Sequence, residues 1–213
     1  MKIVLIGATG FVGSALLQEA LNRGHEVTAL VRDPEQLKPR TKLHPHKADV
    51  YNAADVARLV VGHDAVISAF NPGWSSPDLY TLQIKGTKAI IEGVKQADIR
   101  RLLFVGGSGS LEVRVGVQGV DLPGFPEEYK QGALATREAL NMLRQETHLD
   151  WSVLSPSADL FSGERTGRFR LGTDQLLRDA NGESRISVED FALAMIDEVE
   201  HPQHLRRRFT VGY

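Results

Sequence analysis

The sequence predicts an α/β fold in which a mostly parallel sheet carries helices on both faces. Two observations support this prediction. Short apolar runs rich in β-branched residues alternate with longer stretches of helical periodicity, and a glycine-rich turn joins the first run to the first such stretch. Strands buried on both faces by crossover helices have this near-continuous apolar character. A doubly wound arrangement follows, with ligands bound at the carboxyl ends of the strands.

Six strands are expected before residue 158. They cover residues 2–7, 25–32, 41–50, 64–70, 101–107 and 150–157, and Pro45 weakens the third. The helices between them are expected at residues 14–24, 55–62, 76–98 and 126–147. Ser76 is the expected N-cap of the third helix and Pro77 its first residue.

The alternation loosens in the last quarter of the chain. Residues 166–187 carry short runs and turn signals, residues 188–201 have amphipathic helical spacing, and residues 207–213 form a last strand. No repeat, linker or low-complexity tract divides the 213 residues. We expect a single domain over residues 1–213, in which residues 158–213 form a small substrate-side lobe with the last helix and strand.

Composition excludes several classes of protein. The formal net charge of -2 and the pI of about 6.4 do not suggest a nucleic-acid partner. Without cysteine there are no disulfides, thiolate metal sites or cysteine nucleophiles, and the histidines lack partners at a metal-binding spacing, so no metal site is expected. No segment reaches membrane-spanning length, and glycines interrupt the apolar N-terminal run. We therefore expect a cytoplasmic protein.

The segment GATGFVG, residues 7–13, follows the first strand and opens the first helix. Gly7 permits a tight turn, Gly10 lets a pyrophosphate approach the backbone, and Gly13 lets the helix pack closely on the strand. The free N–H groups and the dipole of the helix N-terminus favour such an anion. This context predicts a Rossmann-type dinucleotide site built by Gly7, Ala8, Thr9, Gly10, Phe11, Val12 and Gly13.

With its GxxGxxG spacing the chain resembles the short-chain dehydrogenase/reductase superfamily, in its atypical and extended branches. Further matches are ADV at 48–50, SAF at 68–70, QIKGTKAIIEG at 83–93 and RLLFVGGSGSL at 101–111. The stretches GESRISVEDFALAMIDEVEH and RRFTVGY are similar to the end of small NAD(P)H-binding proteins known as NADH-flavin reductases and biliverdin reductase B-like proteins. The resemblance thus covers essentially the whole chain and implies further cofactor contacts at Asp49, Val50, Ala69, Phe70, Gly106, Gly107, Ser155 and Pro156.

The end of the second strand bears on which dinucleotide is bound. Relatives that bind NAD have an acidic residue there, which bonds the ribose 2′-hydroxyl. Arg32 stands at this position, and a guanidinium can bind a 2′-phosphate through paired, charge-assisted hydrogen bonds. Asp33 comes next, and the alternative is a solvated Arg32–Asp33 pair. We expect NADP(H) to be favoured over NAD(H).

Tyr129 and Lys130 are adjacent and do not match the Tyr-x-x-x-Lys pair of the superfamily. Four residues after Tyr129 stands Ala133, and Lys130 lies about 100° around the helix from Tyr129. Gln83 replaces the asparagine that the superfamily carries on its fourth helix. Only the serine after the fifth strand remains, as Ser108 or Ser110.

The incomplete proton relay favours hydride transfer to a flavin or similar planar acceptor. Reducing a ketone needs an acid near neutral pH, whereas a flavin ring accepts hydride directly, as in the biliverdin/flavin reductases that this sequence resembles. Ser108 and Tyr129 are the candidate catalytic residues; Ser155 and Ser157 are secondary polar candidates. Trp74 either lines the pocket or packs against the C-terminal lobe. A carbonyl compound remains an alternative substrate.

Two other functions remain open. A non-catalytic NADP-binding redox sensor, like nitrogen-regulator relatives, also explains an absent relay. An NAD-dependent nucleotide-sugar epimerase or dehydratase is disfavoured because the roughly 55 residues after the sixth strand are few for a substrate domain. The expected oligomeric state is a monomer or a homodimer, the latter by analogy with relatives that pair their two long helices.

Overall fold

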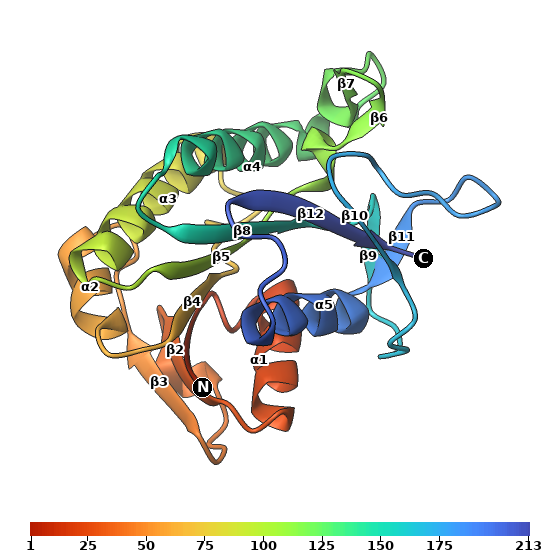
Figure 1. Cartoon of the computed structure of the whole chain (residues 1–213). Coiled ribbons are helices and arrows are strands. Elements are labelled where there is room, and N and C mark those ends of the chain that lie inside the picture. Colours follow the sequence, from red (N-terminus) through yellow and green to blue (C-terminus); the bar gives the residue numbers. More distant parts are fainter.

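The computed structural model describes all 213 residues, and an eight-stranded sheet forms its centre (Figure 1). The strand order is β10-β12-β8-β5-β4-β1-β2-β3, and every neighbouring pair is parallel except β10 with β12. Helices cover both faces of this sheet, so the predicted doubly wound α/β fold is confirmed. Pro45 lies in β3, which is an edge strand and can accommodate a residue without an N–H group.

The expected elements appear in the expected order. The six strands are β1 (Lys2–Ile6), β2 (Glu26–Val31), β3 (Leu43–Lys47), β4 (Ala65–Ser68), β5 (Arg101–Val105) and β8 (Asp150–Ser155). The helices between them are α1 (Phe11–Asn22), α2 (Ala53–Val60), α3 (Leu79–Gln96) and α4 (Glu127–Gln145).

The predicted start of α3 was wrong. Ser76 does not cap the helix; its carbonyl accepts a hydrogen bond from the Leu79 N–H at 3.2 Å, which makes residues 76–79 a turn. The helix begins at Leu79, the first of these side chains to be buried, and Asp78 precedes it. Burial of an apolar side chain therefore sets this helix start, in preference to the local capping signal.

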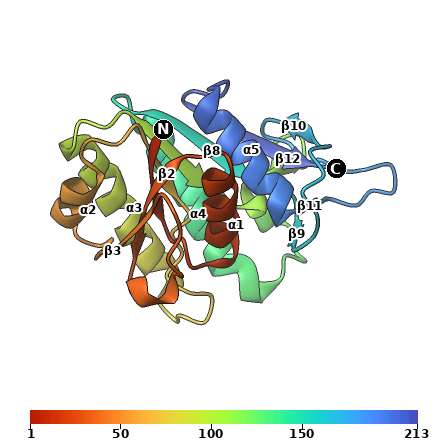
Figure 2. The ribbon, with the colours of Figure 1, turned by 90° about the horizontal axis from the view of Figure 1, so that it is seen from below.

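Two hydrophobic clusters lie on opposite faces of the sheet. Side chains alternate along β1, so Ile3 and Leu5 join one cluster with α1 and the last helix, α5 (Val188–Glu200). Val4 and Ile6 join the other cluster with α2, α3 and α4. Figure 2 shows α1 and α5 side by side, which agrees with their joint membership of the first cluster.

The last quarter of the chain adds to the central sheet. The predicted last strand is β12 (Arg207–Gly212), which pairs with β8, and β10 (Arg170–Gly172) pairs with β12 at the edge. A separate two-stranded sheet joins β9 (Asp159–Phe161) to β11 (Arg185–Ser187).

One small antiparallel pair was not predicted. It consists of β6 (Glu112–Arg114) and β7 (Val117–Gln118), between short 3-10 turns at Ser108–Ser110 and Gly119–Asp121. A further 3-10 turn covers Pro34–Gln36 after β2. None of the helices has the length and apolar character needed to cross a membrane.

Candidate cofactor and acceptor site

The three glycines of the turn after β1 have different surroundings. Gly7 has φ +84°, and a Cβ on it would lie 2.5 Å from the Ala69 carbonyl oxygen. A Cβ on Gly13 would lie 1.9 Å from the Gly7 carbonyl oxygen, so the helix cannot pack this closely with any other residue there. Gly10 differs: its φ is -78°, and a Cβ would meet only the Gly7 oxygen at 3.4 Å. The space beside Gly10 is therefore open to a ligand.

The N-terminus of α1 offers free hydrogen-bond donors. Gly10 is the N-cap and has no side chain to accept from the helix, and the first turn contains no acidic residue. The N–H groups of Phe11, Val12 and Gly13 have no acceptor within the protein. Such donors, together with the helix dipole, suit a pyrophosphate. Thr9 and Gly10 are exposed beside them, and Ala8 is buried.

The end of β4 is held by buried groups from α3. A Cβ on Gly86 would lie 2.3 Å from the Phe70 ring, and that ring meets Tyr51 edge to face with centroids 5.7 Å apart. The Gln83 side chain, buried in α3, donates to the Phe70 carbonyl oxygen at 3.2 Å. Gln83, at the position of the superfamily's asparagine, therefore holds the backbone after β4 in place.

Of the serines after β5 and β8, two make side-chain hydrogen bonds within the protein and two make none. The Ser110 hydroxyl accepts from Arg208 at 3.0 Å, and the Ser157 hydroxyl donates to the Val211 carbonyl at 2.8 Å. Ser108 is half-buried and makes no side-chain hydrogen bond. Ser155 is buried, and its hydroxyl has no partner at all. The structure thus separates Ser108 from Ser110, which the sequence left as alternatives.

Ser155 ends β8 at the same sheet edge as the glycine turn. A Cβ on Gly106, just after β5, would lie 2.7 Å from the Ser155 hydroxyl oxygen, so the two strand ends touch. A buried hydroxyl without a partner costs free energy, about 1–3 kcal/mol, so a hydrogen-bonding partner for Ser155 would stabilise the protein. The open glycine, the free N–H groups and this hydroxyl together fit a dinucleotide laid across the edge.

Arg32 is free, and Asp33 is engaged in its own loop. The Asp33 carboxylate accepts from the Glu35 N–H at 3.1 Å and from the Gln36 side chain at 3.2 Å, capping the short turn after β2. No ion pair joins Arg32 to Asp33, although both residues are exposed. Arg32 is exposed and makes no hydrogen bond.

After β3, the side chains of Asp49 and Val50 both make contacts within the protein. The Asp49 carboxylate accepts from the Tyr51 N–H at 3.0 Å, and the half-buried Val50 packs on the core. Burial raises the pKa of the Tyr51 hydroxyl.

Tyr129 and Lys130 lie in the first turn of α4 and do not act as a pair. The Lys130 ammonium is 3.3 Å from the Glu127 carboxylate in an ion pair on the helix surface. Tyr129 is exposed and meets the Trp74 ring edge to face. Trp74 packs on Gly132 of α4, so its packing partner is not the C-terminal part of the chain.

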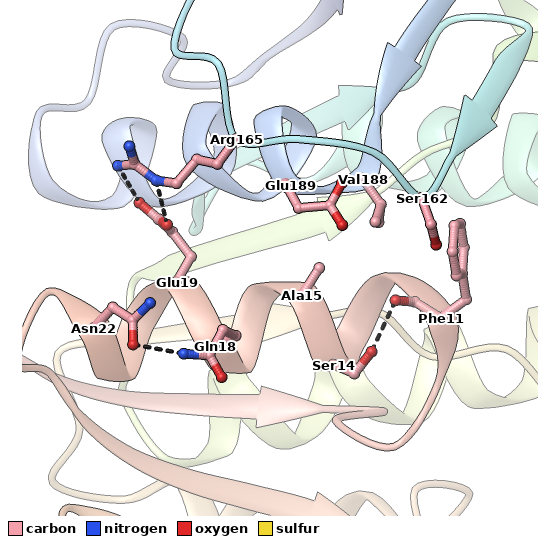
Figure 3. Close-up of a pocket in the computed structure, with 10 residues that line it drawn as sticks. All are labelled: Phe11, Ser14, Ala15, Gln18, Glu19, Asn22, Ser162, Arg165, Val188 and Glu189. Atoms are coloured by element: carbon pink, nitrogen blue, oxygen red, sulfur yellow. Dashed lines mark hydrogen bonds and ion pairs between the residues drawn. The ribbon is translucent and has the colours of Figure 1, made fainter.

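A groove of about 400 Å³ runs along the outer side of α1 (Figure 3). Its far wall is the segment that carries Ser162 and Arg165, and the Phe11 ring stands at one end. Arg165 donates twice to Glu19, at 2.8 and 2.9 Å, which with Arg23 holds the pKa of the Glu19 carboxyl below its ordinary value. This contact ties residues 162–165 to the helix whose N-terminus faces the proposed phosphate site.

No cluster of His, Asp or Glu that could hold a metal ion is present.

The family of the chain follows from comparison with known proteins. A family model described as NAD(P)H-binding matches residues 7–202. The chain belongs to this NAD(P)H-binding family. It is 40% identical to the protein YwnB of Bacillus subtilis (strain 168) over 214 residues, which cover 99% of this chain and 98% of YwnB.

Solved structures of similar proteins share the whole fold. One from Bacteroides thetaiotaomicron, provisionally assigned as an epimerase, has a TM-score of 0.94 and 52% identity over 100% of this chain and 96% of its own. One from Streptococcus pneumoniae TIGR4, provisionally assigned as an NADH-flavin reductase, has a TM-score of 0.87 and 34% identity, over 100% and 99% of the two chains. The predicted resemblance to this NAD(P)H-binding group of the short-chain dehydrogenase/reductase superfamily is confirmed, and the chain has its oxidoreductase-like fold.

Proposed function

We propose that this chain is a reductase that passes hydride from NADPH to a flavin or a similar planar acceptor. One observation supports this most: the groups that fit the cofactor are present, whereas no acid–base pair accompanies them. Ala133 stands where the superfamily has its lysine, Lys130 pairs with Glu127 on the surface, and Gln83 is bound to the Phe70 carbonyl. A flavin ring delocalises the charge that hydride brings and needs little help from a tuned acid.

The roles of the protein in this proposal are binding and orientation. When bound, the nicotinamide supplies the hydride. The free N–H groups at the start of α1 bind the pyrophosphate, and the Ser155 hydroxyl supplies a buried hydrogen-bonding group at the end of β8. Ser108 has a free hydroxyl beside the turn after β5, where it can donate to the acceptor or position a water. Orientation alone can supply a large part of a rate acceleration.

We extend the proposal to a preference for NADPH over NADH. Arg32 is exposed and unpaired at the end of β2, and the neighbouring Asp33 carboxylate is occupied by its own loop. A guanidinium without a protein partner is available to a 2′-phosphate.

The test is to mix the purified protein with NADPH and riboflavin or FMN and follow absorbance at 340 nm, with NADH in parallel. We expect saturable oxidation that prefers NADPH. Arg32→Ala should raise KM for NADPH at least about tenfold and leave KM for NADH unchanged, because one charge-assisted bidentate contact is worth roughly 1.5–3 kcal/mol. Lys38→Ala, which removes another exposed cation from the same loop, is the matched control.

The same experiment distinguishes a second candidate, a redox sensor that binds NADPH without consuming it. The lack of an acid–base pair supports the sensor as well. Tight NADPH binding with no oxidation across several planar acceptors contradicts the reductase and favours the sensor. An epimerase, the provisional assignment of the Bacteroides thetaiotaomicron protein, needs proton transfer to and from a keto intermediate, for which the residues around Ser108 offer no paired base.

A further inference from the structure

The loop after β4 places two aromatic rings over two helical glycines. The Phe70 ring lies over Gly86 of α3, and the Trp74 ring lies over Gly132 of α4, where an added Cβ would be 2.5 Å from the indole. Glycine inside a helix costs about 0.5–1 kcal/mol relative to alanine. Each helix thus has a glycine, a poor helix former, at the position where an aromatic ring of this loop packs against it. Residues that go against the local preference of their element are most often found at functional or strained sites.

Trp74 is seated on the protein by one side only. It remains 60% exposed, and its neighbour Tyr129 is 53% exposed. The two ring centroids are 5.9 Å apart and the rings are perpendicular. Large aromatic side chains are usually buried or interfacial, so two adjacent exposed rings held at a right angle form an open aromatic corner.

A short series of contacts connects this corner to the turn after β5 that carries the candidate catalytic residue Ser108. Thr136, one turn after Gly132 on α4, donates to the Gly132 carbonyl at 3.1 Å. A Cβ on Gly107 would lie 2.3 Å from the Thr136 hydroxyl oxygen, and Gly107 immediately precedes Ser108. One face of α4 therefore touches both Trp74 and the turn after β5. In Figure 2 the loop after β4 and the segment before α4 lie at the same edge of the molecule.

We propose that Trp74 and Tyr129 are the specificity-determining surface for the acceptor, on which a planar aromatic ring system stacks. This inference rests on the reductase function proposed above and adds where the acceptor binds and why a planar one is preferred. The open indole supplies a large rigid apolar face, and Tyr129 supplies a ring edge and a hydroxyl for the polar rim of a heterocycle. A small aliphatic carbonyl compound has no flat ring that could stack on the indole.

The chain has two tryptophans, which allows a direct binding test. Trp74 is exposed, whereas Trp151 is buried in β8 at 3% exposure. Riboflavin is titrated into the protein loaded with NADP⁺, and tryptophan emission is followed with free N-acetyltryptophanamide as the correction for absorbed light. We expect saturable quenching in the wild type that is lost in Trp74→Phe, because only the buried Trp151 then emits.

Kinetics with the same flavin provide a second readout. Trp74→Ala should raise KM for the flavin about tenfold, as expected when one ring stack is lost, with little change in kcat at saturation or in the Kd of NADPH. Gly132→Ala should act in the same direction although it leaves both rings in the sequence, because its methyl group displaces the indole. Thermal unfolding of Gly132→Ala is measured beside the kinetics, because its gain in helix propensity is opposed by the collision with the indole. Tyr80→Ala, at another exposed aromatic residue on α3, is the matched control and should change nothing.

The outcomes separate this inference from the function on which it rests. If the wild type oxidises NADPH with flavin but Trp74 and Gly132 can be changed without effect on KM or quenching, the aromatic corner is not the acceptor surface and the reductase stands. If quenching is saturable but no flavin is reduced, the reductase is wrong and the corner still binds planar rings. If Trp74→Ala changes only the oligomeric state measured by light scattering, the corner is a contact between copies of the chain and the inference is overturned.

Discussion

Gly7, Gly10 and Gly13 share a side chain and differ in what surrounds them. Gly7 and Gly13 are required by the fold, since a Cβ on either collides with backbone at 2.5 and 1.9 Å. Gly10 has an ordinary φ and room for a methyl group, so the fold does not require glycine at this position. Within one motif, the requirements of the fold and those of a ligand can therefore be tested separately.

Gly10→Ala should weaken NADPH binding at least about tenfold while the melting temperature without cofactor stays within about 2 °C of the wild type, because the added methyl group occupies only the ligand's space. Isothermal titration and calorimetry measure the two quantities. Gly13→Ala is the contrasting variant and should lose stability even without cofactor. Unchanged NADPH affinity in Gly10→Ala would place the pyrophosphate elsewhere.

Ser155→Ala should stabilise the cofactor-free protein and weaken its response to cofactor. The Ser155 hydroxyl is buried without a partner, so its removal relieves an unfavourable burial of about 1 kcal/mol. Thermal unfolding with and without NADPH measures both effects. Ser157→Ala is the control: its hydroxyl donates to the Val211 carbonyl at 2.8 Å, so its loss should destabilise both states alike. An unaltered NADPH-induced shift in Ser155→Ala would argue against a cofactor contact there.

At the scale of elements, the start of α5 organises the segment that follows β9. The Ser187 side chain caps α5 by accepting from the Asp190 N–H. The buried Asp190 carboxylate in turn accepts from the Thr166 hydroxyl at 2.5 Å, the Gly167 N–H at 2.8 Å and the Tyr213 hydroxyl at 2.9 Å. One carboxylate therefore joins a loop, a helix and the C-terminal residue.

Asp190→Asn should loosen residues 163–167. The amide replaces one acceptor oxygen with a donor, which leaves a donor of the loop unpaired at a cost of about 1–3 kcal/mol. The expected result is faster hydrogen exchange at the Gly167 N–H, measured by mass spectrometry. Glu189→Gln is the control, since Glu189 accepts only an exposed bond from the Gly163 N–H. Equal exchange in both variants would mean that Asp190 does not hold this loop.

At the scale of the whole molecule, a buried polar network connects α5 to the central sheet. The Glu198 carboxylate, 3% exposed, accepts from Arg101 of β5 at 2.9 Å, from Ser152 of β8 at 3.0 Å and from the His204 N–H at 2.9 Å. Burial acts to raise the pKa of Glu198, but the bonds from His204 and Gln203 outweigh it and hold the pKa below its ordinary value.

This network predicts a loss of stability in acid. Because the pKa of Glu198 is lower in the folded state, its contribution is complete above the unfolded pKa of about 4.3 and disappears as pH falls through the folded pKa. Urea unfolding across this range should show the decline, with a smaller slope in Glu198→Gln. At neutral pH that variant should lose about 3–5 kcal/mol, since Arg101 is left buried without its carboxylate. Glu35→Gln, at an exposed site, should change stability by less than about 0.5 kcal/mol; a matching slope in both variants would contradict the assignment.

Periodicity and the glycine motif predicted the central elements well, and the two failures have different causes. The β6–β7 pair was missed because its strands have only three and two residues and an irregular register, which leave little periodicity to detect. The start of α3 was misplaced because burial of Leu79 outweighed a local cap. That burial cannot be seen within a short window of sequence.

The sequence by itself determined the order and type of the main elements, the position of the glycine-rich turn and the absence of the Tyr-x-x-x-Lys pair. These depend on residues that are neighbours in the chain, where side-chain spacing and backbone preference act directly. Only the tertiary structure decided which groups of the site are free. Ser110 is engaged by Arg208, 98 positions away, and Trp74 is seated on Gly132 of another helix. Such choices arise from packing between distant segments, which local patterns do not contain.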